Sequence, residues 1–112
     1  MALERGKLSD IVVVSAGTTS DIITVASSKK VYVKSIAAFD VTGAGSTAHV
    51  YVIPNGGSVG AATKLYNITL SANETALIEP SYPIVLDTTG DKISVGSVGA
   101  NINFFITGDK EA

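Results

Sequence analysis

The alternation of hydrophobic and polar side chains is most regular in residues 30–41. The apolar set on one parity is Val31, Val33, Ala37, Phe39 and Val41, and the set on the other parity is Lys30, Tyr32, Lys34 and Asp40. Because alternate side chains of a strand point to opposite faces, this pattern predicts a strand that buries the first set and leaves the second in solvent. Ser35 and Ile36 interrupt the alternation, which predicts a bend, a bulge or a second buried contact there.

A second long strand is expected over residues 47–53, with a glycine-containing turn at 42–46 between the two. Ala48, Val50 and Val52 continue the apolar set, and His49 and Tyr51 lie on the opposite parity. Two alternating runs joined by a short glycine turn are typical of a hairpin, so we expect these two strands to pair.

The rest of the chain contains shorter runs of the same kind. Strands are expected at 11–15, 21–26, 64–70, 75–79, 84–87, around Ile93 and Val95, and at 102–107. Pro80 and Pro83 keep the segment between two of these runs out of a central ladder. Turn signals recur every 8–12 residues and no helical period is present, which predicts an all-β, antiparallel sandwich or barrel of about eight short strands.

The chain is divided into three parts by composition. Residues 1–10 are polar and mixed in charge and read as an N-terminal arm, either disordered alone or lying on a neighbouring subunit. Residues 11–108 contain the runs of the β-sandwich domain, and residues 109–112 read as a polar tail. The N-terminus has no apolar core of a secretory signal, so we expect synthesis and maturation in the host cytoplasm.

Overall composition narrows the classes of function. The 112 residues are 46% hydrophobic and 16% charged, with a mean hydropathy of +0.37, yet no run is long enough to span a bilayer. We therefore expect a sheet core together with a subunit interface. The net charge of −2 argues against nucleic-acid binding, and with no cysteine there is no thiolate nucleophile, disulfide or cysteine zinc site.

Two glycine-rich stretches resemble nucleotide-binding motifs only formally. Residues 43–48 match the G-x-G-x-x-A fingerprint, but a strand rather than a helix follows, and no acidic residue stands at the expected distance. Residues 56–60 lack the Gly-Lys-Ser/Thr ending of a phosphate loop. Both are interpreted as turns, and no cofactor is expected.

The polar side chains offer little catalytic or metal-binding chemistry. His49 is the only histidine and has no partner in a recognisable nucleophile–base arrangement, so no enzymatic activity is expected. Asp87 and Asp91 flank a turn and are too few ligands for calcium, so no metal site is expected. Tyrosines such as Tyr51 and Tyr66 either line a sugar-binding surface or, as is commoner on separate strands, anchor an interface.

Read as an ordered set, several segments resemble a family of small tailed-phage virion proteins. The segments are 22–25, 30–36, 49–57, 71–75, 83–86 and 90–95, within a region of about four-fifths of the chain. The resemblance implies a jelly-roll β-sandwich that acts as a capsid decoration (cement) protein or as a tail-associated module, without enzymatic activity.

A decoration protein would bind and stabilise the shell of the major capsid protein from the capsid exterior, as a homotrimer. The residues then expected to contact the capsid are those of the arm: Leu3, Glu4, Arg5, Lys7 and Leu8. Candidate subunit or surface contacts are His49, Tyr51 and Tyr66. The alternative is a tail-associated structural, receptor-binding or carbohydrate-binding module, in which these last three side chains would matter more than the arm.

Overall fold

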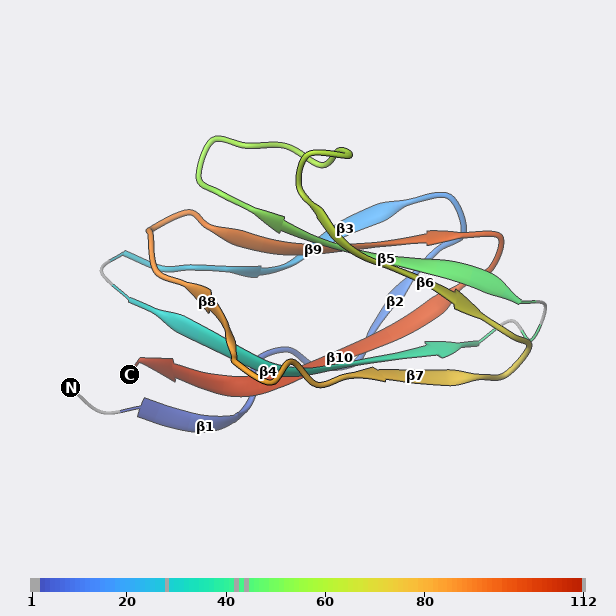
Figure 1. Ribbon diagram of the computed structural model, residues 1–112, viewed down its shortest axis with the longest axis horizontal. Coiled ribbons are helices and arrows are strands. Elements are labelled where there is room, and N and C mark those ends of the chain that lie inside the picture. The colour runs from blue at the N-terminus through green and yellow to red at the C-terminus, as the bar shows by residue number, and fades with distance from the viewer. Residues whose placement is uncertain (1–2, 28, 42, 44, 112) are drawn as a thin grey trace.

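The computed structural model describes residues 3–27, 29–41, 43 and 45–111, and these fold into two stacked β-sheets, seen edge-on in Figure 1. The strands are β1 (Leu3–Lys7), β2 (Val12–Val14), β3 (Thr19–Thr24), β4 (Val31–Asp40), β5 (Ser46–Ile53), β6 (Lys64–Leu70), β7 (Thr75–Ile78), β8 (Ile84–Leu86), β9 (Lys92–Val98) and β10 (Ile102–Glu111). The described residues include no helix of the length and apolarity that a membrane crossing requires.

The ten strands occupy eight positions. Sheet A has the order β1–β10–β4–β7, with β2 beside β10 and β8 beside β4, and sheet B has the order β3–β9–β5–β6. β1 and β2 pair with successive parts of β10, and β7 and β8 pair with successive parts of β4, so each pair fills one position. Every pairing is antiparallel, and the arrangement is a jelly-roll-like sandwich, which confirms the predicted fold class.

The ladder beside β4 is interrupted between β7 and β8, at the segment that the prolines were expected to keep out of the sheet. Pro80 and Pro83 both lie in this gap. Because proline has no backbone N–H to donate, neither residue can continue the ladder along β4.

The hydrophobic core lies between the two sheets. Ile102, Phe104 and Ile106 are fully buried, as their shared parity predicted. The largest other fully buried side chains come from both sheets: Ile36, Ile53, Leu70, Leu86, Ile93, Val14, Val33, Val50 and Val95.

A bulge in β4 changes which of its side chains point inward. Thr107 of β10 pairs with Ser35, whereas the next residue, Gly108, pairs with Val33, so Lys34 is an extra residue in the ladder. A bulge of this kind shifts the inward–outward alternation by one position. The irregularity predicted next to Ser35 is thus confirmed.

The predicted parity holds only before this bulge. Beyond it the buried side chains are Ile36, Ala38 and Asp40, while Phe39 and Val41 are exposed. The predictions that Phe39 and Val41 are buried and that Asp40 lies in solvent are therefore wrong, because they carried one alternation across the extra residue.

The expected hairpin between β4 and β5 is also wrong. β4 belongs to sheet A and β5 to sheet B, so the glycine turn carries the chain from one sheet to the other. Asp40 ends β4 with its carboxylate buried, and its two oxygens accept hydrogen bonds from Gly43 N at 3.2 Å and Gly45 N at 2.7 Å. Both glycines have positive φ, which a turn of this shape requires.

Both ends of the described chain are strands of sheet A, and the predicted boundaries at residues 10 and 108 do not coincide with strand ends. Residues 3–7 form β1, which pairs in register with residues 107–111 of β10. All five residues of β1 are exposed. The N-terminal strand therefore extends the sheet without contributing to the core, and the polar C-terminal residues up to Glu111 are its partner.

Candidate functional site

The outer face of sheet A, named here the A face, presents four cross-strand rows of side chains. In order along β10 the rows are Val13–Asn103–Phe39–Thr75, then Phe105–Ala37–Leu77, then Lys7–Thr107–Ser35, then Arg5–Asp109–Tyr32–Val85. On β2, β4, β7, β8 and β10 these residues alternate with the inward-facing ones, and among them Asp109 is itself buried.

Large apolar side chains on the A face are exposed. The exposed fraction is 58% for Leu77, 56% for Val13, 39% for Val85 and 37% for Phe39. Phe105 separates two grooves of about 260 Å³ each, one lined by apolar residues next to Phe39 and one lined by basic residues next to Lys34. An apolar surface that runs across several strands of one sheet is typical of an interaction surface.

Asp109 is the polar centre of the basic end of the A face. Its side chain is only 9% exposed, with Lys34 Nζ 2.8 Å from Oδ2 and Arg5 Nε 3.6 Å from Oδ1. The hydrogen bond from Lys34 holds the pKa of Asp109 below its usual value, and the charges of Lys34 and Arg5 add to this effect against the opposing effect of burial.

Two acceptor atoms on the A face are buried without a hydrogen-bond partner among the described residues. They are Asn103 Oδ1 in the first row and Asp109 Oδ1 in the fourth. Arg5 lies close enough to Asp109 Oδ1 for charge attraction but not for a hydrogen bond. A buried acceptor without a donor is costly, and both atoms are shielded from solvent by their own chain.

The outer face of sheet B holds two of the three predicted surface contacts. The His49 and Tyr51 rings lie 6.2 Å apart, and Lys64 Nζ lies 5.9 Å from the centre of the Tyr51 ring. Partial burial lowers the pKa of His49, the Lys64 charge lowers it further, and a side-chain hydrogen bond with Asn67 opposes both.

These contacts do not form one exposed surface. Tyr51 is 6% exposed, so the expectation that it is exposed is wrong. Tyr66 packs against the core from the other side of sheet B. The structure thus brings His49 and Tyr51 together and leaves Tyr66 apart, and the contact role of all three stays a prediction.

The acidic turn between β8 and β9 uses its carboxylates locally. Asp91 accepts hydrogen bonds from Asn55 N at 3.0 Å and Thr88 N at 3.1 Å, and Asp87 Oδ1 accepts one from Thr88 Oγ1 at 3.3 Å. No group of three or more metal-ligating side chains occurs within the described ranges.

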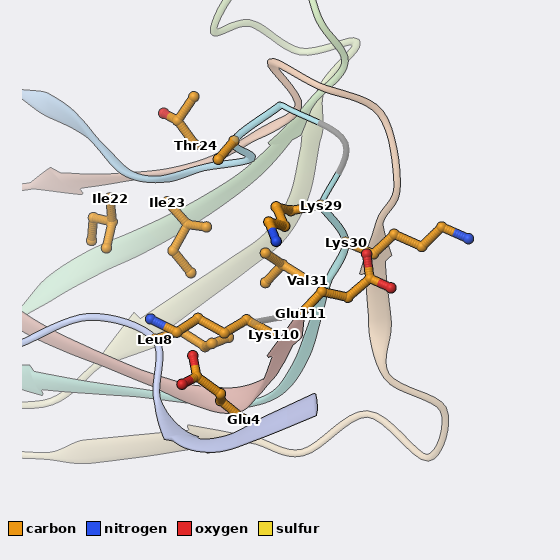
Figure 2. A pocket seen from close by; sticks show the side chains of 11 residues that line it. Glu4, Leu8, Ile22, Ile23, Thr24, Lys29, Lys30, Val31, Lys110 and Glu111 are labelled. Carbon is orange, nitrogen blue, oxygen red and sulfur yellow. The ribbon is translucent and has the colours of Figure 1, made fainter. Parts of the chain in front are cut away.

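A cavity of about 380 Å³ opens between the sheets at the end where β1, β3 and β10 meet, as Figure 2 shows. Ile22, Ile23 and Val31 form an apolar wall, and charged side chains of both signs, including Glu4 and Lys110, stand around it. Two glutamates and three lysines are among the residues that line it.

The predicted capsid-contact residues are placed on two sides of β1. Arg5 and Lys7 point to the A face, in register with Asp109 and Thr107. Glu4 lines the cavity between the sheets, and Leu8 packs against the core beyond the end of β1. Leu3 is exposed at the start of the strand.

Sequence reasoning missed Asn103, Asp109 and Leu77 as surface residues of interest. Asn103 could have been noticed in the sequence. It is a polar residue between two buried positions of β10, and the next residue of the same parity is the large apolar Phe105. Asp109 gave no such signal, since it looked like part of a solvated tail until β10 was seen to extend to Glu111.

No protein-family model and no curated protein sequence matches this chain. Among solved structures, the chain is similar to one from a study of Bacillus endospore appendages, described as a family of disulfide-linked pili, at 18% identity and a TM-score of 0.48, covering 97% of this chain and 90% of that one. It is also similar to infectious bursal disease virus chains of the Gt strain (14% identity, TM-score 0.42) and the Gx strain (14%, 0.41). This chain spans only 30% and 31% of those two. At these identities and TM-scores the likenesses carry no functional conclusion.

Proposed function

We propose that this protein is a structural subunit of a virus particle, a decoration protein that binds the outside of the major capsid protein shell. The observation that carries the proposal is the A face, which exposes large apolar side chains from β2, β4, β7 and β8 on one side of sheet A. The resemblance of the sequence to small tailed-phage virion proteins supports the capsid as the place of action.

The mechanism is burial of area rather than chemistry. An interface of roughly 800 Å² per partner suffices for specific association. A decoration protein that also contacts its own copies binds the shell at several points at once, and effective concentration then multiplies weak contacts. β1 is the edge strand of sheet A and is exposed along its length, so it is the element proposed to meet the shell.

The alternative, a carbohydrate-binding tail module, has less geometric support. Sugar recognition of the kind considered needs His49, Tyr51 and Tyr66 on one accessible surface, and they lie on two faces with Tyr51 buried. A tail-associated structural role without sugar binding would use the same A face. It differs from the capsid role only in where on the virus particle the protein is found.

The test uses empty shells of the major capsid protein from the same source genome. Purified protein is expected to co-sediment with the shells, and Leu77→Asp on the A face is expected to reduce occupancy. Val98→Asp is the matched control, because Val98 is similarly exposed, at 53%, but belongs to sheet B. Failure of the unmodified protein to bind shells, or equal loss in both variants, would contradict the proposal.

A further inference from the structure

We infer that two copies of this chain pair through the outer edge of β6, side by side and antiparallel, around a two-fold axis at Ile68. The pairing joins the two copies of sheet B into one continuous sheet. It concerns an edge of sheet B, which the proposed function does not use. The inference rests on the backbone groups that β6 leaves unpaired and on the contrast between β6 and the other sheet edges.

The hydrogen-bond alternation across sheet B fixes which backbone groups of β6 point outward. Val52 N donates to Thr63 O at 2.9 Å, so the even-numbered residues of β5 direct their backbone groups toward β6. Their partners in β6 are Tyr66, Ile68 and Leu70. The N–H and C=O groups of Asn67 and Thr69 therefore point away from β5, and among the described residues no strand lies beyond β6 in this sheet.

In the part of the chain that the structure describes, the other three sheet edges carry features that hinder pairing. β1 has charged side chains at three of its five positions, and β2, on the same edge, is only three residues long. Pro80 and Pro83 interrupt the edge formed by β7 and β8. β3 has a bulge between Asp21 and Ile23. Charges, prolines, short strands and bulges are the means by which proteins block edge-to-edge association.

β6 has none of these features over residues 66–70. This stretch reads Tyr-Asn-Ile-Thr-Leu and contains no charge, glycine or proline, and its register with β5 is unbroken. The bulge of β6 lies before it, next to Leu65. A regular stretch with outward-facing backbone groups and no blocking feature is an open pairing site.

A pairing centred on Ile68 uses all five of these residues. It places Asn67 of each copy opposite Thr69 of the other, and each such pair exchanges both of its N–H···O bonds. An axis at Asn67 would instead place Thr69 opposite the bulged Leu65. Because the same edge is used in both copies, pairing leaves neither copy with an open β6, and association closes at two.

The side chains of β6 are self-complementary in this register. On the inner side, Ile68 meets its own copy at the axis, and Tyr66 lies opposite Leu70 of the other copy. Tyr66 and Ile68 are half-buried and pack against the core, so pairing covers their exposed parts and joins the two cores along this edge. On the outer side the exposed Asn67 and Thr69 meet, and no like charges oppose each other.

The arrangement leaves the A face free. The two-fold axis of such a pair is perpendicular to sheet B, so the copies of sheet A lie in one layer and both A faces point in the same direction. A dimer of this kind presents two A faces to one surface at once, which raises the effective concentration of the second after the first has bound.

The first test is the mass of the purified full-length chain, measured by analytical ultracentrifugation at micromolar concentrations without any shells. A dimer is expected. Thr69→Pro removes an outward N–H without breaking a bond to β5, and it is expected to raise the dimer dissociation constant at least about tenfold.

Thr75→Pro is the matched control and is expected to leave the dissociation constant unchanged. Thr75 is an exposed residue of β7, the edge strand of sheet A. Glu74 O accepts a hydrogen bond from Asp40 N of β4 at 3.1 Å, so the N–H of the next residue, Thr75, points away from β4. Thermal melting of both proline variants shows whether they are folded.

The second test fixes the register and uses the absence of native cysteine. Ile68→Cys places two thiols opposite each other at the axis, with Cα atoms about 4.5 Å apart, and is expected to form a disulfide-linked dimer under mild oxidation. Leu65→Cys, on the same strand, is the control. Its two copies lie roughly 20 Å apart along the paired strands, so it is expected to form none.

A monomer, a trimer or an open polymer in solution would overturn the inference, as would equal weakening by the two proline variants or equal disulfide formation by the two cysteine variants. A trimer would instead support the homotrimer expected from the sequence. If Thr69→Pro does not fold, the cysteine variants decide. Because no shell is present, these outcomes are independent of the capsid proposal: shell binding by a monomer would leave that proposal standing and remove this one.

Discussion

Lys34 and Asp109 form an ion pair across sheet A, with Lys34 Nζ 2.8 Å from Asp109 Oδ2, and Lys34 is itself the extra residue of the β4 bulge. The residue left out of the ladder is therefore the one that pairs with Oδ2 of the nearly buried carboxylate on the neighbouring strand. This relationship fixes the register of β4 against β10 where the A face changes from apolar to basic.

Removing the Lys34 ammonium should make stability depend on pH in a defined window. The pKa of Asp109 is lowered in the folded protein, so this pair stabilises the fold above the ordinary value of 3.8, and the contribution is lost as pH falls through the folded pKa. Lys34→Met should therefore unfold at lower urea than the unmodified protein at neutral pH, and the two should converge in acid. The measurement is urea unfolding from pH 7 downward, and a difference that persists below both pKa values would contradict the assignment.

Adjacent phenylalanines in β10 should respond very differently to truncation. Phe104 is fully buried between the sheets, and Phe104→Ala is expected to cost about 3–5 kcal/mol of unfolding free energy. Phe105 lies on the A face, and Phe105→Ala is expected to cost less than about 1 kcal/mol in the monomer. The measurement is chemical denaturation of both variants. Comparable losses of unfolding free energy would mean that the A face is not an exposed surface.

Asp40 should contribute stability through the turn that joins the two sheets. Asp40→Ala leaves two backbone N–H groups, those of Gly43 and Gly45, without their acceptor, at an expected cost of about 1–3 kcal/mol. Asp40→Asn keeps one acceptor oxygen and should lose less. Equal losses in the two variants would show that burial of the side chain, rather than hydrogen bonding to the turn, sets its contribution.

Removal of residues 2–7 should separate binding from folding. Because every described side chain of β1 is exposed, the shortened protein is expected to keep a cooperative thermal transition while its occupancy on capsid shells falls. An unfolded truncated protein would mean that β1 is needed to cover the edge of β10. In that event its assignment as the shell-contacting element fails.

Much of the fold followed from alternation, and the errors have identifiable causes. Nine of the ten strands were predicted, because half-buried strands alternate visibly. β1 was not, since Leu3–Lys7 buries no side chain and so shows no apolar parity. The parity of Phe39 and Asp40 was inverted by one extra residue, Lys34, whose presence in the ladder depends on pairing with β10, far away in sequence.

The candidate site was less predictable than the fold. Excess hydrophobicity indicated an interface but not its location, which depends on strands from both ends of the chain meeting in sheet A. Tyr51 was assigned to a surface by parity, and Tyr66 was assigned to one by its residue type. Tyr51 is on the outer side of sheet B as that parity implies, yet neighbouring side chains such as Lys64 cover it.

The central claim, that this is a structural protein of the capsid exterior, is tested most directly by immunogold labelling of intact virus particles from the source with an antibody to this protein. The account predicts label spread over the head of the particle. Label confined to the tail would mean that the A face binds a tail component, which would contradict the decoration role. The absence of label on any particle would contradict a structural role in the virion altogether.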